Sequence, residues 1–365
     1  MMFFLLFIAL FYCIAICLLI YGFTKVKNYD AIDLEPKTAF TIIVPFRNEA
    51  GNLPVLLESI SKLNYPTNLF EVILVDDQST EKFQILNSKF QVLLINNIRV
   101  SNSPKKDAIS TAIPLVKTPW IITTDADCVV PENWLLTLDN YIQTHEVAMI
   151  SGAVTYRCNN SFLDHFQQLD LASLQGATIG SFGIKKGFMC NGANLAYTKL
   201  LFQELNGFEG NDTVASGDDV FLLQKAIAKF PQKVHYLKSQ NNIITTSAVV
   251  SWKTLFYQRV RWASKTSSYQ SNFGKLLALV VFAGNLSLII SYGLWIMGLV
   301  SFLLPFSLFF SKCIIDSILI YQANRFLTKD KISYLVLSNL LYPFFSVSVA
   351  LYSLFGKYEW KGRRF

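Results

Sequence analysis

The chain has 365 residues, of which 52% are hydrophobic, 14% aromatic and only 16% charged. Ordinary soluble domains carry about 25% charged residues, so this composition excludes a protein that is soluble along its whole length. The net charge is +7, but no basic stripe with interleaved aromatic residues is present, which argues against a nucleic-acid partner. The six scattered cysteines lack zinc-ligand spacing and fit a reduced, cytosol-facing compartment.

Apolar segments lie at both ends of the chain. Residues 1–24 carry no charged side chain and are long enough to cross a bilayer. A basic start and a small-residue cleavage site are missing, so we expect a transmembrane anchor rather than a cleaved signal peptide. Residues 276–356 are predicted to form two or three further spans: a helical pair bent near Ser301–Pro305, and a last span from about Ile332 to Phe355 that contains Pro343.

Basic residues flank these segments and predict their orientation, because cytoplasmic loops are enriched in Lys and Arg. Lys25 and Lys27 follow the first span, the loop 324–331 carries three basic residues, and a basic tail ends the chain at residues 357–365. These flanks cannot all be cytoplasmic if every apolar segment crosses completely. One apolar segment is therefore interfacial or re-entrant in one interpretation, and the number of complete spans is left at three or four. We predict a multi-pass protein of the cell (inner) membrane with a cytosolic central domain.

Residues 25–250 are predicted to form that central α/β domain. Strands are expected at 39–46, 70–75, 90–95 and 120–123, and helices at 53–63 and near 105–112. Strands that alternate with helices indicate a Rossmann-like, mostly parallel sheet, which binds ligands beyond the carboxyl ends of its strands. The chain has no glycine-rich phosphate loop, so a phosphate-bearing ligand would be held by a metal and side chains.

Three of the predicted strands end in polar or acidic clusters. These are Asn48-Glu49, Asp76-Asp77 and Asp125-Ala126-Asp127. Residues i and i+2 of a strand point to one side, so Asp125 and Asp127 are expected to face one cation together. Carboxylates combined with substrate phosphates typically hold Mg²⁺ or Mn²⁺. The alternative is an ordinary turn, in which Asp is common for local reasons.

Two later segments complete the pattern. Asp218 and Asp219 precede an apolar helix predicted over 220–230, where an acid serves either as a helix cap or as a general base. Residues 251–275 are predicted to contain an amphipathic interfacial helix, with Trp252, Leu255, Phe256 and Trp262 on one face and Arg259 and Lys265 elsewhere.

In this order, the segments resemble family 2 glycosyltransferases with a GT-A fold. The matching elements are Val44 to Glu49, Val75 to Ser79, Lys106, Asp125 and Asp127, Gly217 to Asp219, and Gln258-Arg-Val-Arg261-Trp262. They cover roughly residues 40–265. The flanking apolar segments resemble the subset that includes hyaluronan synthases, poly-N-acetylglucosamine synthases and ceramide glucosyltransferases.

The resemblance implies a role for each matching residue. Pro45, Glu49 and Asp77 would border the base and ribose of the nucleotide, and Lys106 would lie near it. Asp125 and Asp127 would hold Mg²⁺ or Mn²⁺ on the diphosphate. Asp219, next to Asp218, would be the general base. Gln258, Arg261 and Trp262 would close over the diphosphate and the acceptor.

Two departures from the family pattern concern the lysine and the acidic pair. The usual Gly-Lys-Ala-like stretch reads Lys105-Lys106-Asp107, and the usual Glu-Asp pair reads Asp218-Asp219. The resemblance implies an inverting enzyme that moves a sugar from a nucleotide sugar, with a UDP-sugar as first choice, to a lipid or glycan acceptor. A processive polysaccharide synthase and a catalytically inactive membrane scaffold remain the alternatives.

Overall fold

The structure is a computed structural model that describes residues 2–32, 34–81, 88–211, 216–328, 330–356, 359–360 and 363–364. The chain divides into two compact units. The first, here called the α/β unit, comprises Lys27–Arg157 and Met189–Ser247. The second, the helical unit, comprises Met1–Val26, Cys158–Phe188 and Ala248–Phe365. The segment 158–188 thus leaves the α/β unit, although the sequence analysis placed it inside the central domain.

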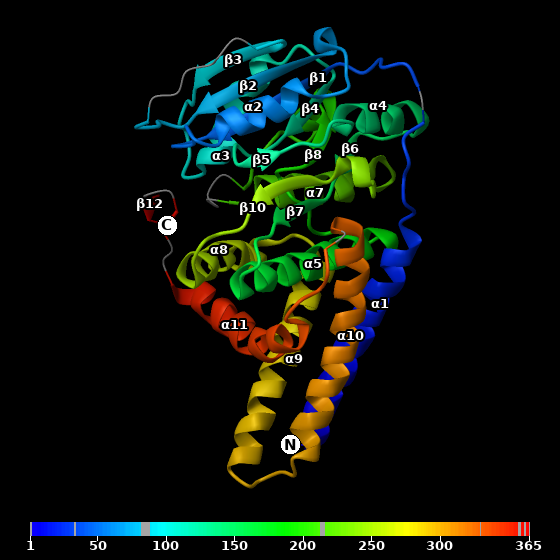
Figure 1. Cartoon of the computed structure of the whole chain (residues 1–365), viewed down its shortest axis with the longest axis vertical. Coiled ribbons are helices and arrows are strands. Elements are labelled where there is room, and N and C mark those ends of the chain that lie inside the picture. The colour runs from blue at the N-terminus through cyan, green and yellow to red at the C-terminus, as the bar shows by residue number, and fades with distance from the viewer. Residues whose placement is uncertain are drawn as a thin grey trace. The chain divides into compact units, whose positions relative to one another are not determined.

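A seven-stranded sheet forms the centre of the α/β unit (Figure 1). Its order is β3-β2-β1-β4-β8-β6-β9. The bounds are β1 Phe40–Phe46, β2 Phe70–Asp76, β3 Gln91–Asn96, β4 Trp120–Thr123, β6 Met149–Ser151, β8 Leu195–Thr198 and β9 Val234–Tyr236. The first four strands of this order are parallel, and β8 is antiparallel to both of its neighbours. The mostly parallel sheet predicted from the sequence is confirmed.

Helices and a smaller sheet surround these strands. The helices of the α/β unit are α2 Leu53–Ser61, α3 Pro104–Ala112, α4 Trp134–Thr144, α6 Lys199–Glu204 and α7 Asp218–Lys229. The smaller sheet has the order β5-β10-β7, with β5 Cys128–Val129, β10 Ile244–Ser247 and β7 Val154–Arg157. Short 3₁₀ turns lie at Thr67–Leu69, Ile113–Leu115, Pro231–Lys233 and Gln240–Asn242.

The core of the α/β unit explains why β1 reads as an almost continuous apolar run. This strand lies between β2 and β4 and is buried on both faces, as expected for a central parallel strand. Ile42 and Val44 belong to one core cluster with Leu56 of α2 and Trp134 of α4. The indole of Trp134 is fully buried and donates to Asn194 Oδ1 at 3.1 Å.

The helical unit contains six long helices among the described residues. They are α1 Met2–Lys25, α5 Phe162–Gly183, α8 Trp252–Ser264, α9 Asn272–Ile296, α10 Leu303–Leu327 and α11 Leu335–Phe355. Four of them, α1, α9, α10 and α11, are long and apolar enough to cross a membrane. The predicted helical pair is confirmed as α9 and α10. A 3₁₀ turn at Thr266–Ser268 follows α8, and the short strands β11 Glu359–Trp360 and β12 Arg363–Arg364 pair near the chain end. Most of the predicted basic tail, like Lys329, lies outside the described residues.

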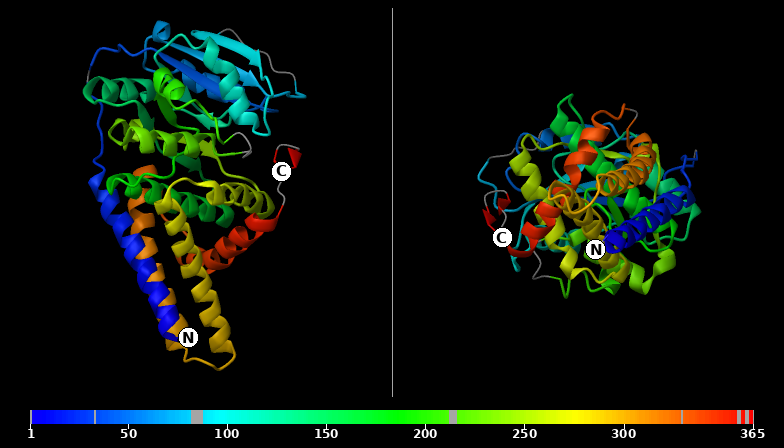
Figure 2. Two further views of the ribbon diagram at one scale, coloured as in Figure 1. Left: turned by 180° about the vertical axis from the view of Figure 1, so that it is seen from behind. Right: turned by 90° about the horizontal axis from the view of Figure 1, so that it is seen from below.

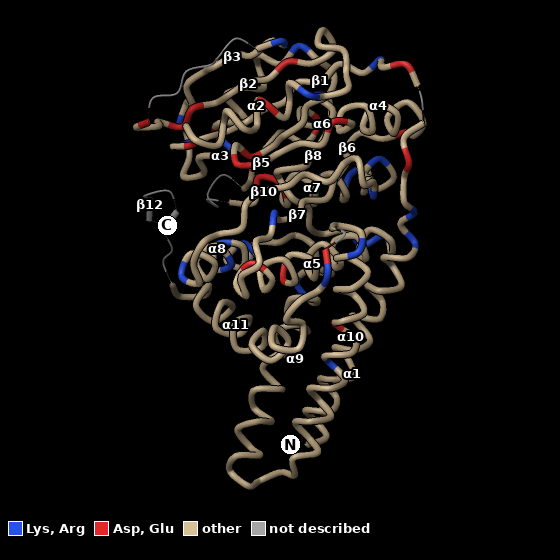
Figure 3. The backbone as a smooth tube through the Cα atoms, in the orientation of Figure 1, with Lys and Arg blue, Asp and Glu red and all other residues tan. Residues whose placement is uncertain are grey.

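The courses of these helices differ. α1, α9 and α10 run side by side, and their lower ends in Figure 3 carry no charged residue. α11 is inclined to the other three in both side views (Figures 1 and 2) and packs against α8, where Val260 and Val349 share a core cluster. Within α10, Lys312 pairs with Asp316, which also accepts a hydrogen bond from Tyr12 of α1 at 2.7 Å. Charges inside an apolar helix are expected to be paired in this way.

One detail predicted for α8 is wrong. The helix itself is confirmed, but Arg259 does not lie apart from the apolar face: like Leu255, four residues earlier, it is buried, with only 5% of the residue exposed. The reason is a buried partner, because Asp170 of α5 forms an ion pair with it. The apolar pattern of the helix gave no sign of α5.

Helices α1 and α5 cross with their backbones in direct contact. A Cβ atom added to Gly183 would lie 1.8 Å from the carbonyl oxygen of Gly22, and one added to Gly180 would lie 2.3 Å from that of Leu19. Only glycine permits so close an approach between helices.

We therefore expect Gly183→Ala to lower the stability of the helical unit by about 1–3 kcal/mol, the usual cost of overpacking. The matched control is Gly293→Ala in α9, where an added Cβ would meet no atom within 4 Å. Thermal unfolding of both purified variants in detergent measures the difference. Equal melting temperatures for Gly183→Ala and the control would contradict this packing.

Candidate active site

Asp125 and Asp127 lie just beyond the carboxyl end of β4. The strand ends at Thr123, and the two acids occupy the turn that leads to β5. The strand-alternation argument for their common orientation therefore does not apply, because they are not in the strand. The hydroxyl of Thr123 donates to the carbonyl oxygen of Gly192 at 2.9 Å, which ties the end of β4 to the loop 190–194.

The second acidic pair opens α7. Gly217 precedes the helix with a φ of 85°, a left-handed conformation that glycine adopts without strain. Asp218 is buried. The carboxylate of Asp219 accepts from the backbone N–H of Gly192 at 2.8 Å and from that of Val220 at 2.7 Å. The Gly192 bond comes from another loop, so helix capping does not account for it.

Lys105 joins the two acidic pairs. Its Nζ lies 2.6 Å from Asp125 Oδ1 and 3.5 Å from Asp218 Oδ2. Burial acts to lower the pKa of Lys105, but Asp125, Asp218 and Asp219 together raise it above its ordinary value. A Cβ on Gly192 would lie 3.1 Å from Lys105 Nζ and 3.2 Å from Asp218 Oδ2, so this glycine lets the loop approach closely. We call Asp125, Asp218 and Asp219 with Lys105 the carboxylate cluster.

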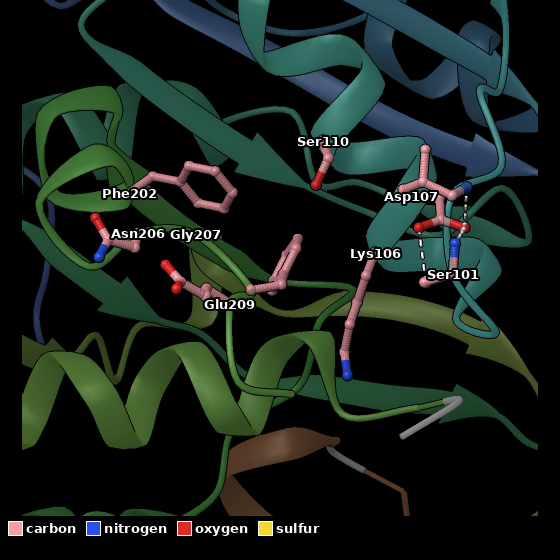
Figure 4. A pocket seen from close by; sticks show the side chains of 10 residues that line it. Ser101, Lys106, Asp107, Ser110, Phe202, Asn206, Gly207 and Glu209 are labelled. Atoms are coloured by element: carbon pink, nitrogen blue, oxygen red, sulfur yellow. Dashed lines mark hydrogen bonds between the residues drawn. The ribbon is translucent and has the colours of Figure 1, made fainter. Parts of the chain in front are cut away.

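The structure thus brings together residues from three predicted motifs, but the lysine among them is not the one singled out from the sequence. Lys106 is 2% exposed, and its ammonium group donates to the carbonyl oxygen of Asn211 and lies over the ring of Phe221, 5.1 Å from the centroid. It lines a cavity of about 340 Å³ together with Asp107 and Glu209 (Figure 4). Two adjacent lysines look alike in a sequence; the helix geometry of α3 distinguishes them, because neighbours in a helix point about 100° apart.

The residues predicted to border the nucleotide lie at the ends of β1 and β2. Asp77 is 5% exposed, accepts from Asn97 Nδ2 at 2.7 Å and lies 3.5 Å from Arg99 Nη1. Arg47 donates to the carbonyl oxygen of Asp77 at 2.9 Å and so connects the loops that follow the two strands.

The other two residues predicted on the nucleotide side lie on β1 and in the loop that follows it. Pro45 pairs in register with Val75, and Glu49 accepts from Asn52 Nδ2 at 2.6 Å. The parallel order β2-β1-β4 places these strand ends at one edge of the sheet, as the sequence predicted.

The remaining predicted residues belong to the helical unit. Gln258, Arg261 and Trp262 lie on α8, which begins after Ser251, whose hydroxyl caps the helix by accepting from the Thr254 N–H at 3.1 Å. Their approach to a diphosphate stays a prediction.

Asp125 and Asp127, in the turn between β4 and β5, fit a divalent metal ion whose remaining ligands come from a substrate. Among the residues that the structure describes, no group of three or more His, Cys, Asp and Glu side chains could hold a metal. Mg²⁺ and related ions, however, commonly use only one or two carboxylates together with substrate phosphates. Asp127 is exposed and Asp125 is 40% exposed at its side chain, so both are accessible to such a ligand.

Comparison with known proteins identifies this domain. Residues 41–205 match the family model Glycosyl transferase family 2. A mannosyltransferase, PcManGT from Pyrobaculum calidifontis in complex with GDP-Man and Mn²⁺, superposes with a TM-score of 0.59 at 16% identity, covering 96% of this chain and 99% of that one. No curated protein sequence matches the chain.

Two further structures are less similar. TarS 1–349 from S. aureus has a TM-score of 0.43 at 14% identity, covering 89% of this chain and 95% of that one. Glucosyl-3-phosphoglycerate synthase from Mycobacterium tuberculosis, in complex with Mn²⁺, UDP and phosphoglyceric acid, has a TM-score of 0.43 at 15% identity, covering 63% and 78%. At these TM-scores neither structure supports a conclusion about this chain.

Residues 41–205 thus match family 2 glycosyl transferases, and the GT-A fold predicted from the motifs is confirmed. The described part of the chain also contains four helices that are long and apolar enough to cross a membrane.

Proposed function

We propose that this glycosyltransferase is a metal-dependent, inverting enzyme that transfers a sugar from a nucleotide sugar to a lipid or lipid-linked acceptor at the cytosolic face of a membrane. The carboxylate cluster is the observation that carries the proposal. It brings an acid of the β4–β5 turn, Asp125, into one site with the candidate base Asp219 through Lys105 and Gly192. Ligands of such sheets bind at this edge.

Asp125 and Asp127 would hold Mg²⁺ or Mn²⁺, which would neutralise negative charge on the leaving diphosphate. The Mn²⁺ in the mannosyltransferase of the same fold supports a divalent ion. Lys105 adds a fixed positive charge beside Asp125. This ammonium group is held by Asp125 and Asp218, so its charge is already in place before a donor binds.

Asp219 would accept the proton of the acceptor hydroxyl. Two backbone N–H groups hold its carboxylate in one orientation, so the base needs little reorganisation when the acceptor arrives. Attack opposite the leaving diphosphate inverts the anomeric carbon. Asp218 has a different task, since its buried carboxylate faces Lys105.

The inclination of α11 suggests how all the basic flanks can lie on the same side of the membrane. α1 and α10 run in the same direction, since Leu5 of α1 clusters with Leu304 and Leu308 of α10 near the first ends of both helices. If α1, α9 and α10 cross the membrane and α11 lies along its surface, Lys25 and Arg325 end on one side, and the chain end stays there too. By the positive-inside rule this side is cytosolic, which supports an inner-membrane protein with a cytosolic catalytic domain.

Purified full-length protein in lipid, given a panel of radiolabelled sugar nucleotides, tests the proposed function. We expect hydrolysis or transfer with one class of donor, UDP-sugars first, and dependence on Mg²⁺ or Mn²⁺. Chromatography of the product from membranes then separates the alternatives: one added sugar supports the lipid glycosyltransferase, and a ladder supports the processive synthase suggested by Gln258, Arg261 and Trp262. Inactivity with every donor in native membranes would contradict both.

A further inference from the structure

Helix α5, which the sequence motifs did not indicate, holds the chain that enters α8. Gln167 of α5 is fully buried. Its side-chain amide donates to the carbonyl oxygen of Val249 at 2.9 Å, and its side-chain oxygen accepts from the Val249 N–H at 3.0 Å. This reciprocal pair of bonds fixes the backbone two residues before the Ser251 cap of α8.

One turn further along, α5 contacts the middle of α8 through a buried ion pair. Arg259 Nε donates to Asp170 Oδ2 at 2.5 Å, and the two side chains are only 5% and 4% exposed. Burying two charges carries a desolvation penalty that apolar packing would avoid. If the contact served only to attach α8 to α5, apolar residues at positions 170 and 259 would stabilise it equally well.

The guanidinium of Arg259 contacts more than Asp170. Its Nη1 donates to Gln258 Oε1, and its central carbon lies 4.1 Å from the ring centroid of Trp262. The planar group therefore touches the first and the last residue of the Gln-X-X-Arg-Trp element at once. An arginine can do this because its N–H donors lie in the plane of the guanidinium, whereas an aromatic ring stacks above that plane.

We propose that Asp170 is a positioning residue for the Gln-X-X-Arg-Trp element and acts through Arg259; this inference rests on the proposed function. Asp170 holds the guanidinium, the guanidinium orients the amide of Gln258, and the ring of Trp262 stacks on its face. The side chains proposed to contact the donor, Gln258 and Trp262, are thus oriented before it binds.

Other contacts keep α8 in place when this charge is removed. Val260 clusters with Val349 of α11, the rings of Phe256 and Tyr352 lie 5.4 Å apart, and Gln167 still holds Val249. Loss of the Asp170 charge is therefore expected to disturb the orientation of two side chains more than the position of the helix.

The test uses the full-length protein in lipid and measures kcat and KM for the donor. Asp170→Asn is expected to lower kcat about 10- to 100-fold, as small misplacements of positioning groups do, with a smaller change in KM, and Asp170→Glu is expected to restore much of the loss. The matched control is Asp164→Asn, a buried acid on the same helix that contacts its own N-cap, Ser161, and should leave kcat near the wild-type value.

A double-mutant cycle with Trp262→Ala distinguishes positioning from general destabilisation. If Asp170 acts through the element, Asp170→Asn has little further effect in the Trp262→Ala background. Additive losses, or a wild-type kcat in Asp170→Asn, would overturn the inference while leaving the proposed function intact. If Asp170→Asn does not fold, Arg259→Lys is tested instead. This variant keeps the positive charge but lacks the planar guanidinium that bonds Gln258 and stacks on Trp262. An unchanged kcat in Arg259→Lys would overturn the inference.

Discussion

Replacing Asp219 by Asn is expected to lower kcat for sugar transfer by roughly 10²- to 10⁴-fold, the usual contribution of a general base, while nucleotide-sugar binding persists. Asn has almost the same size as Asp but cannot take up the proton of the acceptor hydroxyl. The carboxylate of Asp219 accepts from the backbone N–H groups of Gly192 and Val220. The amide oxygen of Asn can still accept from one of these groups, but its NH2 group cannot accept from the other. Single-turnover transfer and calorimetric donor binding measure the two effects.

The control for Asp219→Asn is Glu204→Gln, an exposed acid at the end of α6 in the same unit. It removes one negative charge at a place that the proposed mechanism does not use, so kcat should stay at the wild-type value. Transfer by Asp219→Asn at the rate of this control would show that Asp219 is not the base, and the search would move to Asp218.

Replacing Asp127 by Ala is expected to remove the metal-dependent part of nucleotide-diphosphate binding. In the wild type, Mn²⁺ should tighten binding of the diphosphate by at least about tenfold, or about 1.4 kcal/mol, because the ion joins protein carboxylates to phosphate. Asp127 is a cleaner target than Asp125, whose removal would also release Lys105 from its ion pair. Titration calorimetry of the nucleoside diphosphate with and without Mn²⁺ gives both affinities.

Glu132→Ala serves as the matched control, because Glu132 is exposed on the segment between β5 and α4. Its only described bond there is through its backbone carbonyl, which accepts from Asn64 N–H. The control should keep the full Mn²⁺ effect. The metal assignment fails if Asp127→Ala shows the same gain in affinity with Mn²⁺ as Glu132→Ala does.

Much of the α/β unit follows from local patterns. Apolar runs predicted β1, β2, β3 and β4 almost to the residue. For β1, β2 and β4 the reason is burial on both faces, which requires a continuous apolar run, whereas β3 is a largely exposed edge strand. Gly217-Asp218-Asp219 likewise predicted the start of α7. What the pattern did not supply was the conformation of Asp125 and Asp127. It placed the end of β4 at Thr123, as the structure does, but the alternation of side chains along a strand does not extend into the turn that follows.

The sequence alone indicated the resemblance to family 2 glycosyltransferases, the parallel sheet, the strand-end acids and the apolar helices, because each depends on composition and spacing within a short segment. Only the tertiary structure decided that Lys105, and not Lys106, faces the acids, and that Arg259 is buried against Asp170. Asp170 and Arg259 are 89 residues apart in the chain. Arg259 follows Leu255 by four residues and precedes Trp262 by three, so helical spacing places it on their face of α8. The acid that pairs with it there comes from a distant helix, which no pattern within α8 can indicate.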